Sequence, residues 1–166
     1  MIENSDAVDG GVGPLSAYRE AVDAKYGAGS RYGVALHLMR VERHVGATIE
    51  SVLRQYKLSR PQWSVLTILH LAPATRIPLG RIATALQVHG TIITNAVDRL
   101  AVLGLAERVV DPGDRRSVLA IITDDGERCV DDIMTKLAEQ QFGLKELAAR
   151  DIGTLSRILN TVCPEE

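Results

Sequence analysis

Residues 91–123 have the sequence TIITNAVDRLAVLGLAERVVDPGDRRSVLAIIT, and this stretch decides the fold. Its first part has apolar residues at helical spacing and ends at Gly104, a residue type that commonly follows the last turn of a helix. Two runs rich in β-branched residues come next, over 105–110 and 117–123, and they predict two strands. A Pro-Gly pair lies between the runs and predicts a tight turn. The stretch therefore predicts a helix followed by a β-hairpin.

A shorter helix is predicted just before this stretch, over residues 79–87, with a break at 88–90 before the helix at 91–103. Two helices joined by a tight turn and followed by a hairpin form a winged helix-turn-helix. In this arrangement helix 91–103 is the recognition helix and hairpin 105–123 is the wing. The apolar spacing predicts that four residues of the recognition helix face inward: Ile92, Ala96, Val97 and Leu100.

Amphipathic helices flank this region on both sides, from Arg31 to Tyr56 and again after residue 123, where the apolar stripe continues to Leu147. Ser59 and Gln62 predict a capping box at the start of a helix that precedes residues 79–87. Thr123 predicts the N-cap of the second flanking helix, and Asp151 predicts the N-cap of a last helix. These helices have broad apolar stripes and no sheet to cover, so we expect them to pack on each other and on a second copy of the chain. The fold class is therefore mainly α with a small β-hairpin wing. The predicted parts are a flexible N-terminal arm at 1–30, an N-terminal dimerisation helix at 31–58, a winged helix-turn-helix domain at 59–123 and C-terminal dimerisation helices at 124–166.

Length and composition limit the classes of protein that the chain can belong to. Its 166 residues, 46% of them hydrophobic, suit one domain with helical extensions. We see no apolar run near the ~18 residues of a membrane span and no signal-peptide pattern, so we expect a cytoplasmic protein with no membrane partner. The net charge of −2 is unevenly distributed, with net +2 over 76–122 and net −5 over 123–166. Such a weak positive balance implies few phosphate contacts per copy and a need for two copies on DNA.

The sequence resembles the MarR family of winged-helix transcriptional regulators from about residue 34 to residue 162. VDRLAVLGLAERVVDPGDRRS at 97–117 is similar, without gaps, to the family's Val-Asp-Arg-Leu, glycine and wing signature. IITDDG at 121–126 resembles the family's Leu-Thr-x-x-Gly, which ends the wing, and KLSRPQWSVL at 57–66 resembles the start of its second helix. The resemblance implies a ligand-responsive, DNA-binding homodimer that represses transcription from a pseudo-palindromic operator.

The resemblance places the DNA contacts on the recognition helix and the wing. Thr91 can reach a phosphate or a thymine methyl group, and Asn95 can form a bidentate pair with adenine. Arg99 can contact a phosphate or an acidic side chain. The alternative is that Thr91 only caps the helix and that His89 is only solvated. The complete set of predicted DNA-binding residues is His89, Gly90, Thr91, Thr94, Asn95, Arg99, Arg115 and Arg116.

The tip of the wing carries two arginines and two aspartates. Arg115 and Arg116 are candidates for entering the minor groove, where narrow A·T-rich DNA has an enhanced negative potential. The resemblance leaves a second role open for Arg116, which is to brace the wing by pairing with Asp98 of the recognition helix. Asp111 and Asp114 would repel phosphate, so we expect them to hold the turn and orient the arginines.

The resemblance also implies an effector pocket between the dimerisation helices and the winged domain. Four polar or aromatic residues are candidates to line it: His37, Arg40, His44 and Trp63. A cation beside apolar walls suits a small aromatic carboxylate or another amphipathic anion. Each candidate also has a plainer interpretation, because a single Trp is usually part of a core and an Arg on a helix face is usually solvated or ion-paired.

Other functional classes have weaker support. Cys129 and Cys163 are far apart and form no CxxC motif, so thiol redox sensing stays only as an alternative. The acidic C-terminal segment leaves open a winged-helix module that binds a protein. We find no nucleophile–base pair, phosphate loop or metal-ligand spacing, so we expect no enzyme activity, no metal and no cofactor.

Overall fold

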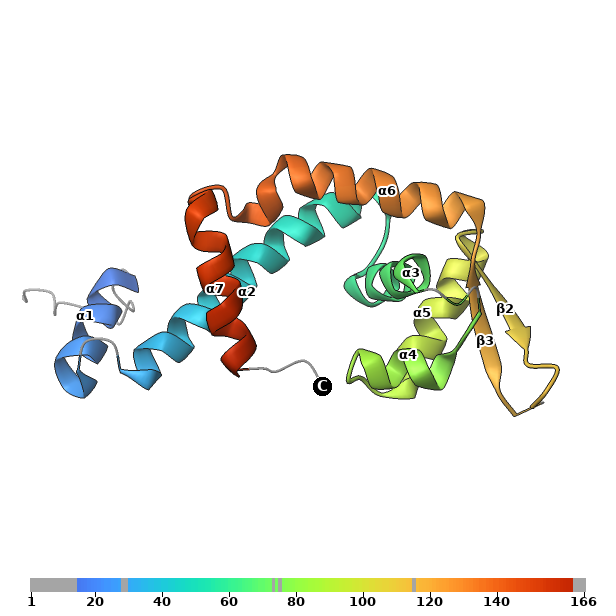
Figure 1. Ribbon diagram of the computed structural model, residues 1–166, viewed down its shortest axis with the longest axis horizontal. Helices are drawn as coiled ribbons and strands as arrows, with labels where there is room; N and C mark the ends of the chain where they lie inside the picture. The colour runs from blue at the N-terminus through green and yellow to red at the C-terminus, as the bar shows by residue number, and fades with distance from the viewer. Residues whose placement is uncertain (1–14, 28–29, 73, 75, 115, 163–166) are drawn as a thin grey trace, which may run out of the picture. The chain divides into compact units, whose positions relative to one another are not determined.

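The structure is a computed structural model, and it is mainly helical with one small antiparallel sheet, as predicted (Figure 1). Its described residues are 15–27, 30–72, 74, 76–114 and 116–162, with side chains described from residue 20 onward. The chain divides into two compact units, Met1–His44 and Val45–Glu166. The boundary between them falls inside helix α2, Arg31–Leu53. Across the described residues, none of the helices has the length and apolar character that a membrane span requires.

The first unit contains helix α1, Leu15–Tyr26, and the first part of α2. Ser30 precedes α2, and its Oγ accepts a hydrogen bond from the amide of Gly33 at 3.2 Å, as an N-cap residue does. Helix α1 lies inside the N-terminal arm predicted at 1–30, whereas residues 1–14 of that arm lie outside the described residues. The part of α2 in this unit exposes several large apolar side chains: Val34, Leu38, Met39 and Val41.

The second unit begins with the end of α2 and holds the predicted helix-turn-helix. Its helices are α3 (Arg60–Leu71), α4 (Leu79–Ala85), α5 (Gly90–Val102), α6 (Asp124–Glu139) and α7 (Ala149–Val162), with 3₁₀ turns η1 (Arg54–Tyr56) and η2 (Gln141–Gly143). The amide of Ser59 donates to Oε1 of Gln62 at 2.7 Å, which completes the predicted capping box of α3. Gly104 follows α5 with φ of +73°, the left-handed conformation that the sequence predicts for it.

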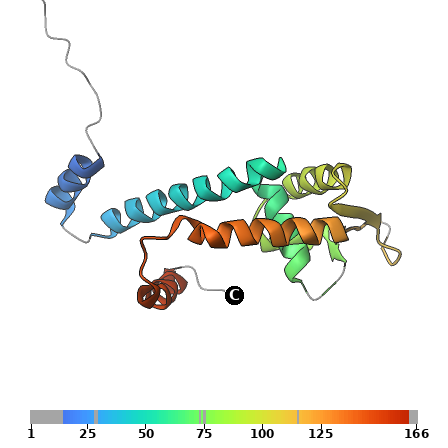
Figure 2. The same ribbon diagram turned by 90° about the horizontal axis from the view of Figure 1, so that it is seen from above.

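Three strands form an antiparallel sheet in the order β1-β3-β2. Strands β2, Ala106–Val110, and β3, Val118–Ile122, form the predicted wing, with Ala106 paired with Ile122 and Val110 with Val118. This hairpin projects beyond the helices in two views (Figures 1 and 2). Strand β1, Ile77–Pro78, was not predicted because two residues, one of them a proline, carry no period-2 pattern.

The core of the second unit lies between the helix-turn-helix and α6. The end of α2 and helix α3 contribute to it as well, and its fully buried large side chains are Leu53, Leu66, Ile82, Ile93, Leu100, Ile133 and Leu137. Thr123 caps α6, as predicted, and its Oγ1 accepts the amide of Gly126 at 3.1 Å. Gly126 packs against the chain just after α5, where a Cβ atom would lie 2.1 Å from the carbonyl oxygen of Leu105. The wing and α6 are therefore in direct backbone contact.

The C-terminal region corrects two predictions. The apolar stripe predicted to continue through residue 147 breaks at residue 140, because Gln141 and Phe142 have positive φ values of 49° and 52°. Asp151 was predicted to be the N-cap of the last helix, but α7 begins at Ala149 and Asp151 lies in its first turn. A carboxylate in a first turn still suits the positive end of the helix. Helix α7 has no buried residue, and its Ile152 is 54% exposed.

Candidate DNA-binding surface

The recognition helix α5 begins with a histidine cap. Nδ1 of His89 accepts the amide of Thr91 at 3.3 Å and lies 3.0 Å from the Thr91 hydroxyl oxygen. In a neutral imidazole, an Nδ1 that accepts leaves the ring proton on Nε2. His89 is exposed, so it presents an N–H donor at the start of the recognition helix. It therefore caps the helix, the role that the sequence analysis considered for Thr91.

The outer face of α5 carries most of the predicted contact residues. Thr91, Asn95 and Arg99 are exposed, whereas Thr94 is partly buried and its hydroxyl donates to the Gly90 carbonyl oxygen at 3.1 Å. A Cβ atom added at Gly90 would meet nothing within 4 Å, so the space beside the first turn is open. Thr91, Asn95 and Arg99 are spaced four residues apart and therefore lie along one accessible side of α5.

The predicted inward orientation of Ile92 is wrong. Ile93 is fully buried and Ile92 is 43% exposed. At 100° per residue, Ile93 lies closer to the direction of Val97 and Leu100 than Ile92 does, so Ile93 takes the centre of the buried face. Ile92 therefore joins the outer face of the recognition helix.

A hollow of about 260 Å³ lies between the start of α3 and the outer face of α5. It has hydrogen-bonding side chains from both helices and apolar walls. Its lining residues include Ser59, Pro61, Gln62, Ile92, Asn95 and Arg99. The outer face of the recognition helix is thus recessed rather than flat.

An ion pair joins the recognition helix to the wing. Oδ1 of Asp98 lies 3.4 Å from Nε of Arg108 on β2, and both side chains are about half exposed. Asp98 therefore pairs with Arg108 and not with Arg116, the partner that the sequence analysis considered. The alternation of the strand favours Arg108 for this contact. Arg108 follows the buried Ala106 by two residues, so both side chains lie on the same face of β2.

The turn of the wing is held by its aspartates. Oδ1 of Asp111 accepts the amide of Gly113 at 2.8 Å, and Oδ1 of Asp114 accepts the amide of Arg116 at 3.0 Å. Backbone hydrogen bonds close the same turn, from Asp111 to Ser117 at 2.9 Å and from Ser117 to Asp114 at 2.8 Å. Arg116 is exposed at this turn, and Arg115 lies outside the described residues. The carboxylates are engaged by backbone amides, and the Arg116 side chain faces solvent.

Comparisons with known proteins show the family to which the chain belongs. The MarR family model matches residues 58–118, which run from the entry to α3 to the start of β3. The HTH-type transcriptional regulator YsmB of Bacillus subtilis is 32% identical over a match that covers 58% of this chain and 68% of YsmB. The chain belongs to the MarR family of transcriptional regulators.

Solved structures of the family share the fold. The MarR-family regulator Sco5413 of Streptomyces coelicolor is 28% identical, with a TM-score of 0.72 over 79% of this chain and 91% of that one. A mutant E. coli MarR, solved in complex with operator DNA, is 24% identical, with a TM-score of 0.65 over 81% of this chain and 99% of that one. The second likeness shows a common fold.

The predicted effector residues of this MarR-family regulator lie in different units. His37, Arg40 and His44 are exposed on α2 in the first unit. Trp63, in the second unit, is partly buried and packs against the hydrophobic core, in line with its plainer interpretation. A pocket that these four residues share stays a prediction.

A histidine–aspartate contact that was not predicted joins α3 and α6. Nε2 of His70 lies 3.4 Å from Oδ1 of Asp131. Nδ1 of His70 is buried and has no hydrogen-bond partner among the described residues. Nothing in the local sequence around His70 predicts this contact, because it depends on how two helices far apart in the chain pack.

Cys129 in the regulator is protected from ionisation. It is partly buried on α6, and burial, together with the nearby Asp132 carboxylate, raises the pKa of its thiol. A raised pKa lowers the thiolate fraction that an oxidant attacks. Cys163 lies outside the described residues.

Within the described part of the chain, His, Cys, Asp and Glu side chains form no group of three that could hold a metal ion.

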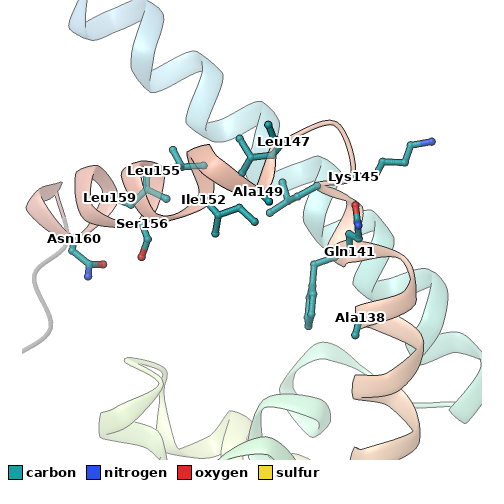
Figure 3. A pocket seen from close by; sticks show the side chains of 13 residues that line it. Ala138, Gln141, Lys145, Leu147, Ala149, Ile152, Leu155, Ser156, Leu159 and Asn160 are labelled. Atoms are coloured by element: carbon teal, nitrogen blue, oxygen red, sulfur yellow. The ribbon is translucent and has the colours of Figure 1, made fainter.

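A larger cavity of about 870 Å³ lies beside α7 (Figure 3). Ile152, Leu155 and Leu159 of α7 line it together with Leu147 and the end of α6 at Ala138. The lining is mainly apolar, and it continues the exposed apolar side of α7. This surface is separate from the outer face of α5.

Proposed function

We propose that this MarR-family regulator is a homodimer that represses transcription by binding a pseudo-palindromic operator. The observation that carries the proposal is the joint presentation of two DNA-reading elements. The exposed start of α5 offers His89, Thr91 and Asn95, and the Asp98–Arg108 pair links this helix to the wing. A recognition helix of this kind enters the major groove by its N-terminal end, while the wing reaches the adjacent minor groove.

The proposed contacts divide into base-reading and backbone-positioning groups. Asn95 is assigned to a base edge, and Gly90 allows the backbone of α5 to approach the duplex closely. Thr91, Thr94 and Arg99 are assigned to phosphates or nearby bases. Arg115 and Arg116 are assigned to the wing tip and its groove, with Asp114 holding the turn.

Dimerisation is supported by apolar surface and by charge. Helix α7 buries no residue, and α2 exposes Val34, Leu38 and Val41 in its own unit. Uncovered apolar surface of this extent marks a protein–protein contact. Two copies place two recognition helices about one duplex turn (~34 Å) apart, and this doubles the number of phosphate contacts.

Control by an effector is the third part of the proposal. The proposed effector is a small aromatic carboxylate or a similar amphipathic anion, and its candidate contacts are His37, Arg40, His44 and Trp63. We propose that the regulator works in the cytoplasm by binding and not by catalysis, which agrees with its membership of a family of transcriptional regulators.

A gel-shift titration tests DNA binding. The probe is the duplex upstream of the regulator's own gene, at two salt concentrations, with wild type and Arg116→Ala. We expect salt-sensitive binding by wild type and a loss of roughly fivefold or more in affinity for Arg116→Ala. Arg150→Ala, which removes an exposed charge from α7, is the matched control and should bind like wild type. Binding of a protein partner with no DNA retained would contradict the proposal.

A further inference from the structure

Ile92 is a large apolar residue that the fold leaves exposed in the first turn of the recognition helix. Its side chain is 43% exposed, whereas the adjacent Ile93 is fully buried. Single exposed apolar residues are common on protein surfaces, so exposure alone assigns no role. The position of Ile92 is the informative feature, because the N-terminal residues of a recognition helix are those that face base edges.

The surroundings of Ile92 combine apolar and hydrogen-bonding groups. Asn95 lies one turn further along α5, on the same side, and Arg99 lies one turn beyond it. These residues share with Pro61 and Ile92 the hollow of about 260 Å³ beside α3. The polar side chains can bind the hydrogen-bonding atoms of a base edge, but they gain nothing from an apolar group.

Thymine supplies such an apolar group, because its C5 methyl is the distinctive apolar feature of base edges in the major groove. Isoleucine in a helix is held in one χ1 rotamer, so Ile92 presents its methyl groups in a fixed direction and loses little entropy on contact. We propose that Ile92 determines sequence specificity by packing against the C5 methyl group of a thymine next to the base that Asn95 contacts. This inference rests on the proposed function of operator binding.

A thymine-to-deoxyuridine scan tests the proposal. The probe is the tightest-binding duplex selected by the full-length protein from a randomised pool, with each thymine replaced in turn by deoxyuridine, which lacks the methyl group. We expect wild type to lose about fourfold in affinity at one thymine per half-site, the factor expected when one methyl-sized group is no longer buried. Ile92→Ala should bind the thymine and deoxyuridine forms of that position equally.

Two further variants complete the test. Ile92→Val keeps the β-branch and should keep the sensitivity to that methyl group. Val102→Ala truncates the apolar residue that is 78% exposed at the other end of α5 and should behave like wild type. Equal losses in wild type and Ile92→Ala, or indifference to every thymine methyl group, would overturn the role of Ile92 while leaving DNA binding intact. Failure to select any duplex would overturn the proposed function and the role of Ile92 with it.

Discussion

Asp98 and Arg108 show how a weak contact between single residues can matter for binding. Their side chains are about half exposed, and solvent screens an ion pair of this kind, so it contributes at most about 1 kcal/mol to stability. The pair nevertheless connects α5 with β2, and these two elements belong to the recognition helix and the wing that we propose to contact DNA. Its main effect is therefore on the orientation of the wing.

Asp98→Ala should separate stability from binding. We expect the free energy of unfolding to fall by less than about 1 kcal/mol, because the pair is solvent-exposed. DNA affinity should fall by roughly fivefold, although removing a negative charge would by itself strengthen binding to phosphate. Urea denaturation and fluorescence anisotropy on one preparation measure both quantities. Glu146→Ala removes a carboxylate from another exposed ion pair and is the control; a gain in affinity for Asp98→Ala would contradict the bracing role.

Cys129 should make stability depend on alkaline pH. Burial and Asp132 raise the pKa of its thiol in the folded chain, so the unfolded chain loses the proton first. Stability should therefore fall as the pH rises above the ordinary thiol pKa of about 8.5. Denaturation curves at a series of pH values should show a shallower alkaline decline for Cys129→Ala than for wild type. Equal slopes would argue against the raised pKa.

At the scale of elements, local signals predict most of the second unit. Ser59 with Gln62 marks the start of α3, Gly104 marks the end of α5, and Thr123 marks the start of α6, and all three have the predicted geometry. Caps and turns depend on residues within a few positions of one another, so a single sequence carries this information. Strand β1 was not predicted, because residues 77–78 form a strand only through their pairing with β3.

The errors on the candidate site have a different cause. Ile92 and Ile93 both stand four residues before an apolar residue of α5, so spacing alone does not decide which one faces the core. Packing decides it, and Ile93 is buried. The partner of Asp98 is likewise fixed by how β2 lies along α5, which is a tertiary property. The recognition helix and the wing are therefore predictable from the sequence, whereas the side-chain contacts at their junction depend on tertiary packing.

Gly126 provides a test of close packing between elements. A Cβ atom at this position would lie 2.1 Å from the backbone oxygen of Leu105, and a backbone atom does not move aside easily. We expect Gly126→Ala to lower the free energy of unfolding by about 2 kcal/mol or more. Thermal and chemical denaturation measure the loss.

The matched control for this substitution is Gly153→Ala on α7, where an added Cβ atom meets nothing within 4 Å. That variant should be as stable as wild type or up to about 1 kcal/mol more stable, because alanine favours a helix over glycine. If both variants lost the same stability, the contact with Leu105 would not explain the effect.

At the scale of the whole molecule, the apolar side of α7 stays exposed to solvent in a single copy of the chain. Ile152→Glu should weaken dimerisation, because a charge would have to be desolvated at an apolar contact. Sedimentation velocity should show a shift toward monomer, and DNA affinity should fall with it. Thr154→Glu places the same charge about 200° away around the helix and is the control. A dimer unaffected by Ile152→Glu would place the interface elsewhere.

The contacts around Gly126 have a mechanical consequence. The hydroxyl of Thr123 donates to the carbonyl oxygen of Gly104 at 2.7 Å, and the amide of Thr123 donates to the carbonyl oxygen of Leu105 at 3.2 Å. Gly126 packs so closely against Leu105 that no side chain fits between them. The first turn of α6 is thereby locked to the base of the wing, and rotation of α6 must carry both strands with it. In the proposed dimer, a molecule that binds near the far end of α6 would therefore displace the wing of that copy without touching it.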